Sequence, residues 1–541
     1  MPELVLTKEQ ENVIKFDGSL VAIAKPGSGK TTVLSRLIKR KLPNLLSHQG
    51  VIAISYTNKA SDELKKRSTS DGIDIKASFF GTIDKFCDSE IIIPFLSHLW
   101  GRPEEEITVT KMSDLTEDDQ EVFSGITENT VSREQLEENL DAIRSWYKKG
   151  RLFLETNGAL ASYTIDNSLA CQRYLKIRYT HIIVDEYQDS GLEQHELFLK
   201  LQSLGLTAIA VGDPDQSIFG FSNKDPKYLL SLPKKKEFAT YPITKNHRSH
   251  PSIINYSLKL LDEKAELIET HEIRMFRKHR HGNTASICEW IDESILQIVT
   301  QYNIERLSEI GILVRGGSTG REVNLSLRSK HRYFDTHPLE NHLSLWAKIF
   351  AALLSYRYND NDTAQDIIEN SGARIAASET RRIKAEIRRV REIAEDRLYG
   401  QLVEIANALL PKAISNEAVR LLKETEFATL PAFFKAAEDH EIQIMSLHKA
   451  KGLEFDVVFH LDLHEWVLPI KRPGPGNDWD NLEYPTFEQD INLHYVGITR
   501  ARKACFLCTA DQRVNSNGET KRARPSEFLS INGLDKMRLE I

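Results

Sequence analysis

A short apolar run that ends in a glycine-rich turn constrains this chain more than any other feature of its sequence. Residues 20–24 read Leu-Val-Ala-Ile-Ala, residues 25–29 read Lys-Pro-Gly-Ser-Gly, and a periodic segment runs from Thr31 to Lys41. The run predicts a buried strand, and the periodic segment predicts a helix. Glycines in the turn allow backbone N–H groups to wrap phosphate oxygens, and a helix N-terminus adds positive potential. We therefore expect a phosphate-binding loop on an α/β sheet.

Similar apolar runs alternate with helical segments along most of the chain. This alternation is typical of parallel sheets that are covered on both faces. Polar and mostly helical stretches at 88–175 and 360–440 interrupt it twice. We therefore expect an α/β protein with two sheet domains, each containing a helical insertion. The further candidate strands are 51–56, 181–184, 207–212, 310–315, 442–447, 457–463 and 506–510.

The predicted domain boundaries follow from the two insertions, of which the second is the smaller. Within this second insertion, the mixed charges between Arg381 and Arg397 are typical of a solvated helix face, and a nucleic-acid or partner surface is the alternative. Each sheet domain is expected in two parts, one on either side of its insertion. The six predicted segments in chain order are 1–87, 88–175, 176–250, 251–359, 360–440 and 441–541.

Composition narrows the class of protein. The formal net charge of −7 excludes a uniformly basic coat for nucleic acid but allows a local basic groove. Five cysteines in 541 residues indicate a reducing compartment. No apolar stretch reaches the roughly 18 residues that span a bilayer, and the N-terminus lacks a signal-peptide pattern. We therefore expect a cytoplasmic protein without a membrane partner.

The glycine-rich turn fits the P-loop pattern except at Ala24, which stands where the pattern has its first glycine. In such a loop, Lys30 is expected to reach the β- and γ-phosphates of a nucleotide, and Thr31 to ligate Mg²⁺. The residues of this segment that are expected to hold the nucleotide are Ala24, Lys25, Pro26, Gly27, Ser28, Gly29, Lys30, Thr31 and Thr32.

Two adjacent carboxylates, Asp185 and Glu186, follow the candidate strand at 181–184. They would stand at the carboxyl end of that strand, where α/β sheets bind ligands. In that place Asp185 is expected to hold Mg²⁺, and Glu186 is expected to polarise the attacking water. The alternative is that the acidic pair is an ordinary helix N-cap.

Further polar residues are candidates for contact with a nucleotide. Gln216 follows the candidate strand at 207–212 and could sense a γ-phosphate, although the preceding Asp-Pro-Asp is also good turn chemistry. Arg248, Arg500 and Arg502 could neutralise charge on a transferred phosphoryl group. The alternative for each arginine is a surface ion pair.

Taken in order, these motifs resemble those of superfamily-1 helicases of the UvrD, Rep and PcrA type. The similarity runs from residue 6 to residue 502. Thr-Lys-Glu-Gln at 7–10 resembles the adenine-reading motif of the family, and 185–190 resembles its acidic motif II. The remaining similarities are 57–60 to motif Ia, 81–82 to motif Ib, 212–220 to motif III, 246–249 to motif IV, 448–455 to motif V and 495–501 to motif VI.

The resemblance implies two RecA-like domains and a role for individual residues. It implies that Gln10 reads adenine, that His247 occupies the place of an aromatic that stacks on the base, and that Glu454 contacts the ribose. The implied catalytic residues are Lys30, Asp185, Glu186, Gln216, Arg248 and Arg500. The implied DNA-binding residues are Thr57, Asn58, Lys59, Thr82, Phe221 and His448.

Several positions depart from the family pattern. His247 replaces a stacking tyrosine, and Asp84 replaces a histidine and would repel a phosphate. Phe221 replaces a tryptophan but keeps a π-face for a DNA base. Ile491 and Asn492 stand where basic residues are usual.

The function implied by the resemblance is that of a 3′-to-5′ translocase or helicase that uses ATP and Mg²⁺ on single-stranded or tailed duplex DNA. Because the second insertion is small, the chain is also similar to compact members of the family, which include helicase subunits of anti-phage systems such as Gabija. The alternative function is an ATPase that senses nucleotide and DNA and regulates a partner nuclease, with little unwinding of its own. The chain after motif VI is too short for a nuclease domain, so a nuclease is expected on a separate chain.

Two other groups of residues suggest metal or phosphate binding but have simpler explanations. Cys505 and Cys508 lie in a candidate strand without a second pair of ligands nearby, so buried strand cysteines are expected instead of a zinc site. Segment 271–281 contains three histidines and is expected to be a solvated loop, with contact to backbone phosphates as the alternative. Its basic residues are Arg274, Arg277, Lys278 and Arg280.

A β-hairpin is expected at 514–520, because Asn517-Gly518 is a strong tight-turn signal. In the family, a hairpin in this place carries an aromatic tip that stacks on the DNA fork. Asn515 and Ser516 offer no π-face at the tip here. We therefore expect weaker unwinding of long duplexes than translocation on single strands.

Overall fold

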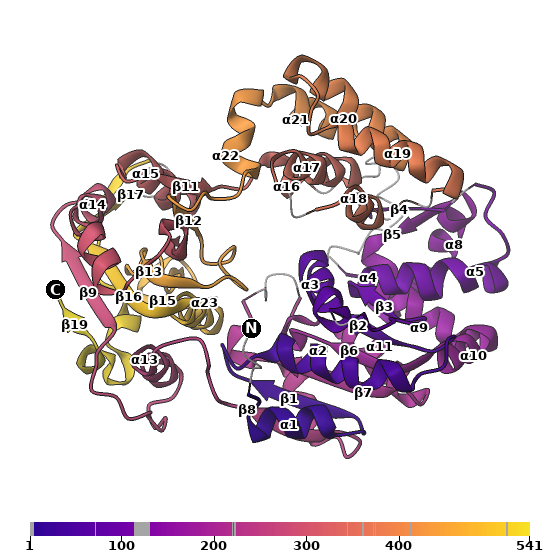
Figure 1. The fold of residues 1–541 in the computed structure, drawn as a ribbon, viewed down its shortest axis with the longest axis horizontal. Coiled ribbons are helices and arrows are strands. Elements are labelled where there is room, and N and C mark those ends of the chain that lie inside the picture. Colours follow the sequence, from indigo (N-terminus) through magenta and orange to yellow (C-terminus); the bar gives the residue numbers. More distant parts are fainter. Residues whose placement is uncertain are drawn as a thin grey trace. The chain divides into compact units, whose positions relative to one another are not determined.

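The computed structural model divides by its internal contacts into two compact units (Figure 1). Unit 1 contains Met1–Pro214, Phe219–Lys245 and His337–Ala428. Unit 2 contains Asp215–Ile218, Asn246–Thr336 and Thr429–Ile541. The residues described are 5–70, 72–105, 107–112, 130–218, 220, 223–342, 344–359, 362–371, 373, 375–411, 413–514 and 518–541.

The centre of unit 1 is a six-stranded sheet in the order β3-β2-β6-β7-β1-β8. Every neighbouring pair is parallel, which confirms the prediction of a parallel sheet from the alternating apolar runs. The strands are β1 (Leu20–Ala24), β2 (Gly50–Ile54), β3 (Phe79–Gly81), β6 (Tyr179–Val184), β7 (Thr207–Gly212) and β8 (Ala239–Ile243).

Two apolar clusters hold helices against opposite faces of this sheet. Because side chains alternate along a strand, Leu20 and Ala22 of β1 belong to one cluster and Val21 belongs to the other. The order strand, turn, helix predicted at the glycine-rich turn is also observed, since β1 leads into α2. The first face carries α1 (Lys8–Lys15), α2 (Lys30–Lys41) and α3 (Asn58–Thr69), and the second carries α9 (Asn157–Asn167) and α11 (Leu192–Ser203).

The stretch at 88–175 is mostly helical in its described residues, as the sequence predicts. Trp100 packs edge-on against Tyr147, with ring centroids 5.4 Å apart, and both belong to the cluster on the second face of the sheet. The insertion therefore shares a core with the sheet. Its elements, with α4 (Ile83–Phe86) before them, include a π-helical turn at Cys87–Ile92, α5 (Ile93–Trp100), β4 (Thr108–Thr110), α7 (Arg133–Glu138), α8 (Leu140–Lys148), β5 (Arg151–Phe153) and α10 (Leu169–Arg178).

A second helical segment, His337–Ala428, also groups with unit 1. Lys85 Nζ in α4 donates a hydrogen bond to Asn370 Oδ1 of this segment over 2.7 Å. The segment begins before residue 360, because α17 packs against the helices that follow it. The sequence does not reveal this grouping. The helices are α16 (Pro338–Asn341), α17 (Leu345–Tyr358), α18 (Ala364–Ser371), α19 (Ala377–Arg389), α20 (Glu395–Leu409) and α21 (Asn416–Glu424).

The centre of unit 2 is a seven-stranded sheet in the order β11-β12-β10-β13-β16-β9-β19. All neighbouring pairs are parallel, and Cys505 and Cys508 are fully buried in β16, as predicted. The strands are β9 (Met275–Arg280), β10 (Ile310–Val314), β11 (His331–Phe334), β12 (Ile442–Ser446), β13 (Phe455–His460), β16 (Ala501–Ala510) and β19 (Leu539–Glu540).

The expectation of a solvated loop at 271–281 is wrong. Met275–Arg280 form β9, which pairs with β16 along its whole length. Only Met275 and Phe276 are buried, and the four residues after them are polar and partly exposed. Because this end of the strand is basic, it contains no apolar run, and apolar runs were the signal used to predict strands.

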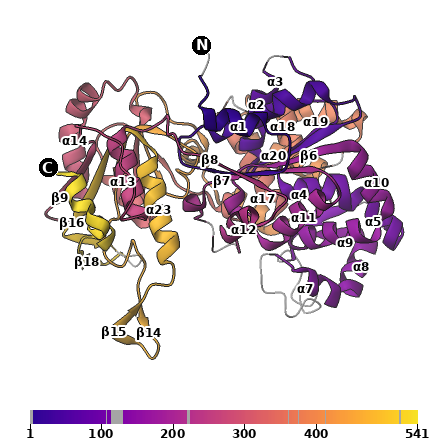
Figure 2. The same cartoon turned by 90° about the horizontal axis from the view of Figure 1, so that it is seen from below.

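Two hairpins extend from the sheet of unit 2. β14 (Arg472–Gly474) and β15 (Asp478–Glu483) project from it (Figure 2). β17 (Gln512–Val514) and β18 (Thr520–Arg522) confirm the hairpin predicted after motif VI, but its tip, 515–517, lies outside the described residues. Among the described helices, none has the length and apolar character that crossing a bilayer requires. The helices of unit 2 include α13 (Pro251–Leu261), α14 (Thr284–Gln301), α15 (Gly317–Ser326), α22 (Leu430–Phe434) and α23 (Phe487–Thr499).

Candidate nucleotide and DNA sites

The glycine-rich turn of unit 1 has the backbone geometry of a phosphate cradle. Gly27 and Gly29 have φ angles of 67° and 77°, a left-handed region that a residue with a Cβ rarely adopts. Gly29 is the N-cap of α2 and provides no side-chain cap, so the first N–H groups of the helix are available to an anion. Ser28 Oγ is buried and has no hydrogen-bond partner among the described residues. These features fit a nucleotide phosphate group.

Gln10 in α1 contacts this turn through its side chain. Its carboxamide oxygen accepts from Thr7 N over 2.9 Å, which completes a capping box on α1. Its Nε2 donates to Ser28 O over 2.9 Å. The residue predicted to read adenine therefore lies against the phosphate loop, and both ends of its carboxamide have protein partners.

Lys30, Asp185 and Glu186 come together at the carboxyl ends of β1 and β6. Lys30 Nζ lies 3.5 Å from Glu186 Oε1, and the backbone N–H of Glu186 donates to Asp185 Oδ1 over 2.9 Å. Glu186 has a φ of 52°, an uncommon left-handed conformation that places its side chain beside that of Lys30. Glu186 stands at the N-cap position of the short turn that follows, but its side chain makes no cap hydrogen bond there.

Burial changes the acidity of Asp185. Burial and the neighbouring charge of Glu186 raise the pKa of Asp185 to about 7, and Lys30 partly opposes this shift. A divalent cation beside this carboxyl group would favour its ionised form. The donor set of Asp185 and Thr31, which is the second residue of α2, consists of the oxygen ligands that Mg²⁺ prefers. The chemistry of these residues therefore fits the predicted metal.

Gln188 links the acidic pair to the end of β7, a role that its place in motif II does not predict. Its Nε2 donates to Glu186 Oε2, and its Oε1 accepts from Asp213 N over 3.0 Å. A Cβ at Gly212 would come within 2.5 Å of Gln188 Oε1. Glycine at this position leaves room for the Gln188 side chain, which connects the predicted base to the motif-III residue Asp213.

In unit 2, Arg500 is buried and hydrogen-bonded to Gln216. Its side chain is 2% exposed, and its Nη2 donates to Gln216 Oε1 over 3.2 Å. Its Nε donates to Val496 O over 3.1 Å, and its Nη1 to Leu453 O over 3.3 Å. Two of the residues predicted to contact the γ-phosphate are therefore in direct contact with each other.

Arg248 and Arg502 both form ion pairs, but their closest carboxylates differ. Arg248 forms an ion pair with Glu454 over 2.5 Å, and its buried Nε has no hydrogen-bond partner in the part of the chain that the structure describes. Arg502 pairs with Asp456 over 2.8 Å and also with Glu309. Arg502 therefore matches the ion-pair alternative, whereas Arg248 keeps one donor for a further acceptor.

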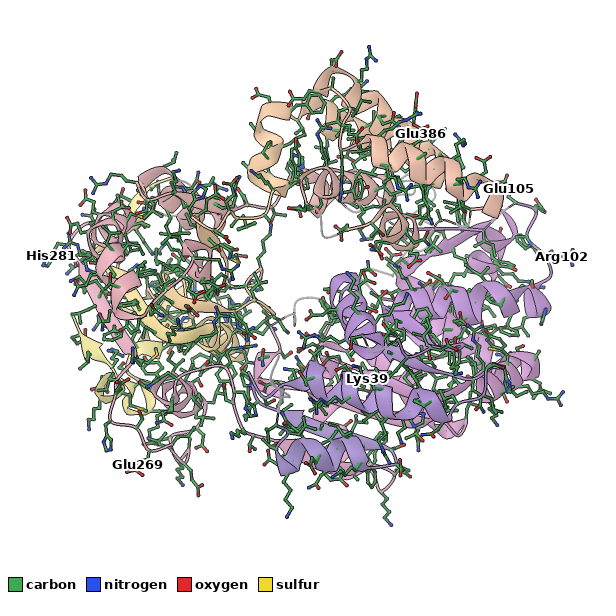
Figure 3. All side chains as sticks on the ribbon, in the orientation of Figure 1. Lys39, Arg102, Glu105, Glu269, His281 and Glu386 are labelled. Carbon is green, nitrogen blue, oxygen red and sulfur yellow. The ribbon has the colours of Figure 1, made fainter. Side chains whose placement is uncertain are left out.

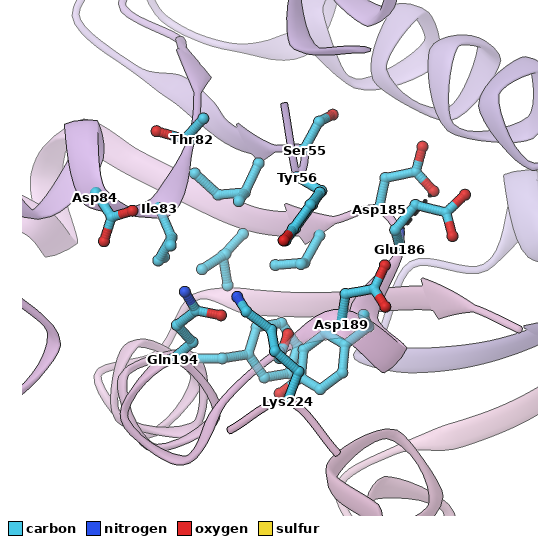
Figure 4. Close-up of a pocket in the computed structure, with 16 residues that line it drawn as sticks. Ser55, Tyr56, Thr82, Ile83, Asp84, Asp185, Glu186, Asp189, Gln194 and Lys224 are labelled. Atoms are coloured by element: carbon cyan, nitrogen blue, oxygen red, sulfur yellow. Dashed lines mark hydrogen bonds between the residues drawn. The ribbon is translucent and has the colours of Figure 1, made fainter. Parts of the chain in front are cut away.

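A small cavity of about 100 Å³ lies beside the acidic pair in unit 1 (Figure 4). Tyr56, Asp84 and Lys224 line it, together with Asp185 and Glu186. Lys224 Nζ stands 5.0 Å from the centre of the Tyr56 ring, a cation–π contact. Burial, followed by the charges of Asp189 and Asp84, raises the pKa of the Tyr56 hydroxyl to about 12. Tyr56 and Lys224 were not predicted, although Tyr56 directly precedes the motif Ia residues.

Two of the predicted DNA-binding residues, Thr57 and Thr82, have a structural role in unit 1. Thr57 caps α3 by accepting from Ala60 N over 3.2 Å, and Thr82 caps α4 in the same way. Asn58 Oδ1 is buried without a hydrogen-bond partner among the described residues. The side chains of Lys59 and Phe221 lie outside the described residues.

The two predicted histidines lie in unit 2 in different surroundings. Burial, Arg315 and Lys451 lower the pKa of His448 to about 4, so its imidazole is neutral at pH 7. His247 is exposed, so its ring is accessible to a base. His448 therefore supplies no positive charge at pH 7.

Comparison with known proteins identifies relatives along almost the whole chain. A family model described as the UvrD-like helicase C-terminal domain matches residues 340–512, and one described as an AAA domain matches residues 10–222. The chain is 26% identical over 544 residues to the Gabija protein GajB of Bacillus cereus, which covers 94% of this chain and 97% of that protein.

Longer helicases match it as well. The chain is 24% identical over 647 residues to a probable DNA helicase II homolog of Rickettsia conorii, with 97% and 95% of the two chains covered. It is 23% identical over 581 residues to the ATP-dependent DNA helicase UvrD2 of Mycobacterium tuberculosis, with 97% and 81% covered. The Rickettsia alignment is longer than this chain of 541 residues, so that relative carries insertions that are absent here.

Proposed function

We propose, from the premise that this chain belongs to the UvrD-like DNA helicases, that it is a motor that hydrolyses ATP to move 3′ to 5′ along single-stranded DNA. Its two parallel sheets are the RecA-like domains of that family. The observation that carries the proposal is the placement of Lys30 3.5 Å from Glu186, at the edge where the phosphate loop and Asp185 meet.

Each residue at this edge of the unit 1 sheet would have its own role in ATP hydrolysis. The phosphate loop and Lys30 would hold the β- and γ-phosphates, and Thr31 and Asp185 would hold Mg²⁺, which neutralises charge on the phosphates when bound. Glu186 would accept a proton from the attacking water. Gln188 would keep Glu186 in position, since it bonds both to its carboxylate and to Asp213.

Unit 2 would supply positive charge to the transition state. Arg500 and Arg248 are the candidates, because a buried guanidinium aimed at the γ-phosphate stabilises its developing charge. Arg500 would exchange its present acceptors, Gln216 and backbone carbonyls, for phosphate oxygens. Glu454, which now pairs with Arg248, would be released towards the ribose.

Single-stranded DNA would be bound by the residues around the cavity of unit 1. The exposed part of the Tyr56 ring offers a π-face for a base. Asp84 lines this cavity as well, and burial raises the pKa of its carboxyl group. His448 and Thr82 would add polar contacts.

A duplex with one single-stranded tail tests the direction of movement. The full chain with ATP and Mg²⁺ is expected to displace the strand of a short 3′-tailed duplex and to leave the 5′-tailed and blunt duplexes intact. Displacement from the 5′-tailed duplex alone would reverse the proposed direction.

A second candidate function is a DNA-sensing ATPase that regulates a partner nuclease in anti-phage defence. The match to a Gabija protein along 97% of that protein's length favours it. The sequence at 515–517, Asn-Ser-Asn, also offers no aromatic for a fork. ATP hydrolysis that DNA stimulates without strand displacement from either tailed duplex would select this function over the helicase.

A further inference from the structure

Three side chains of unit 2 that serve no part of the proposed motor converge on one face of its sheet. His279 lies in β9 and His281 follows this strand, while Asp511 follows β16. β9 and β16 are parallel neighbours in which His279 pairs with Thr509. Because side chains two residues apart share a face, His279, His281, Thr509 and Asp511 all stand on the same side. The register of two strands therefore builds this cluster.

The distances in the cluster are those of metal-ligand candidates. His279 Nε2 lies 3.0 Å from Asp511 Oδ1, and His281 Nδ1 lies 2.8 Å from Asp511 Oδ2. The three ligand atoms all lie within 4.8 Å of one another. Bonds of about 2.0–2.2 Å to a tetrahedral ion place ligand atoms roughly 3.3–3.5 Å apart. Each imidazole nitrogen now faces a different oxygen of Asp511, so the exposed side chain of His281 would have to reorient to bring all three ligand atoms to this spacing (Figure 3).

A supporting contact fixes one of the two imidazoles. His279 Nδ1 lies 3.0 Å from the hydroxyl oxygen of the fully buried Thr509. A partner on the second ring nitrogen sets the tautomer and the ring orientation of a metal-binding histidine. His279 Nε2 is thereby directed at the position that an ion would occupy.

The donor set selects the class of ion. Two imidazoles and one carboxylate suit Zn²⁺ and similar transition metals, whereas Mg²⁺ and Ca²⁺ prefer oxygen ligands. Arg277, Arg522 and Arg524 line the adjoining groove, of about 670 Å³, and their positive charges weaken the binding of any cation. The site is therefore expected to have moderate affinity and to leave an open position for water or an anion.

The cluster stands at the base of the β17–β18 hairpin. β17 begins at Gln512, directly after Asp511, and Ala523 N closes the other end of the hairpin by donating to Asp511 O over 2.7 Å. We infer that His279, His281 and Asp511 bind a Zn²⁺-class ion that ties the end of β9 to the base of this hairpin. The ion is separate from the Mg²⁺ expected at Asp185 in unit 1.

Metal titration of the untagged full chain tests this inference. After treatment with a chelator, calorimetry with ZnCl₂ is expected to show one site per chain, and Co²⁺ should produce visible d–d absorption. Excess Mg²⁺ should not compete. Asp511→Asn and His279→Ala each remove a ligand and should weaken this site more than the roughly 10–100-fold typical of a lost supporting contact.

Matched variants separate this site from surface binding by other histidines. His440→Ala removes a histidine from another His–carboxylate pair on unit 2, in which His440 lies 3.4 Å from Glu438, and should leave the titration unchanged. Thr509→Val should weaken binding by about tenfold. Absence of saturable binding up to 1 mM would overturn the inference, as would equal affinity in the parent chain, Asp511→Asn and His279→Ala. Either result would show that the cluster is only a hydrogen-bonded group.

Discussion

The two units differ in how completely the polar groups of their proposed nucleotide-binding residues are already bonded. In unit 1, the phosphate loop has an uncapped helix N-terminus and a buried serine hydroxyl without a described partner. In unit 2, Arg500 bonds to Gln216 and to two backbone carbonyls, and Arg248 bonds to Glu454. Unit 1 is therefore ready for a ligand, whereas the arginines of unit 2 must exchange partners before they can act.

This difference indicates separate tasks for the two units. The uncapped N-terminus of α2 can bind the phosphates of a ground-state nucleotide without losing a cap hydrogen bond, so unit 1 should account for most of the affinity for nucleotide. An arginine that gives up internal acceptors gains most where negative charge is greatest, which is in the transition state. Variants in unit 1 and unit 2 should therefore affect binding and turnover in different proportions.

The largest effect is expected for Arg500→Lys. Lysine keeps the positive charge but lacks the planar fork that reaches several acceptors at once, so turnover should fall by about 10³-fold or more. Nucleotide affinity, measured with a fluorescent ATP analogue, should change by less than about threefold. Arg502→Lys, in a neighbouring surface ion pair, is the control and should keep normal turnover. An equal loss of binding and turnover in Arg500→Lys would contradict the division of tasks.

Glu186→Gln should reduce turnover by about 10²–10⁴-fold while ATP still binds. The amide keeps the shape of the side chain but cannot accept a proton from water. Glu196→Gln changes an exposed glutamate on α11 and should have no effect. If ATP binding also disappears in Glu186→Gln, then Glu186 is a structural or metal-binding residue and not the base.

Lys30→Ala should reduce both nucleotide binding and turnover, because it removes a positive charge beside the phosphate loop of unit 1. The loss of one preorganised donor typically lowers turnover by about 10²–10³-fold. Lys39→Ala on the same helix is the control, since Lys39 Nζ donates to Ser70 Oγ away from the loop (Figure 3). Thermal melting should show that both variants are folded. Normal hydrolysis by Lys30→Ala would refute the assignment of the phosphate loop.

The smallest expected effect concerns stability, and it comes from a buried histidine pair in unit 2. His460 Nδ1 donates to Leu461 O, so its Nε2 accepts from His494 Nδ1 over 3.0 Å. Burial lowers the pKa of His460 to about 4, and burial together with the neighbouring His460 lowers the pKa of His494 well below its ordinary value. Both folded pKa values lie below the ordinary value of 6.5, so the unfolded chain takes up more protons.

The stability from this pair is therefore fully present above pH 6.5 and is lost as the pH falls towards 4. Each histidine contributes up to about 1.4 kcal/mol per pH unit to the free energy of unfolding in that range. His494→Asn keeps a donor for His460 Nε2 but removes one titrating group, so its melting temperature should fall less steeply between pH 6.5 and 5. Parallel slopes for the parent chain and the variant would exclude the pair as a source of acid sensitivity.

Most strands of both sheets can be predicted from the sequence because each of these is marked by an apolar run within the strand itself. The apolar runs at 20–24, 181–184 and 207–212 each form a buried parallel strand, and Lys30 and Glu186 meet because both follow strands of one sheet. The basic end of β9 was not predicted as a strand from apolar runs, because a strand that is only partly buried need not be apolar.

Other features depend on contacts that no local pattern encodes. The position of α17 among the helices that follow it sets the start of the second helical segment. The bonds from Gln188 to Glu186 and Asp213 join three motifs that are separate in the chain only through folding. The cluster of His279, His281 and Asp511 likewise depends on the register of β9 with β16, which the sequence does not specify.

The steady-state rate of ATP hydrolysis with and without single-stranded DNA tests the central claim most directly. The parent chain with Mg²⁺ is expected to hydrolyse ATP slowly alone and at least about tenfold faster with a saturating oligonucleotide, because a motor couples its nucleotide site to its DNA site by differential affinity. Lys30→Ala should lower both rates by about 10²–10³-fold. The contradicting result would be an ATPase rate that falls in Lys30→Ala but does not change when single-stranded DNA is added. Such a chain would hydrolyse ATP at the phosphate loop without coupling hydrolysis to DNA.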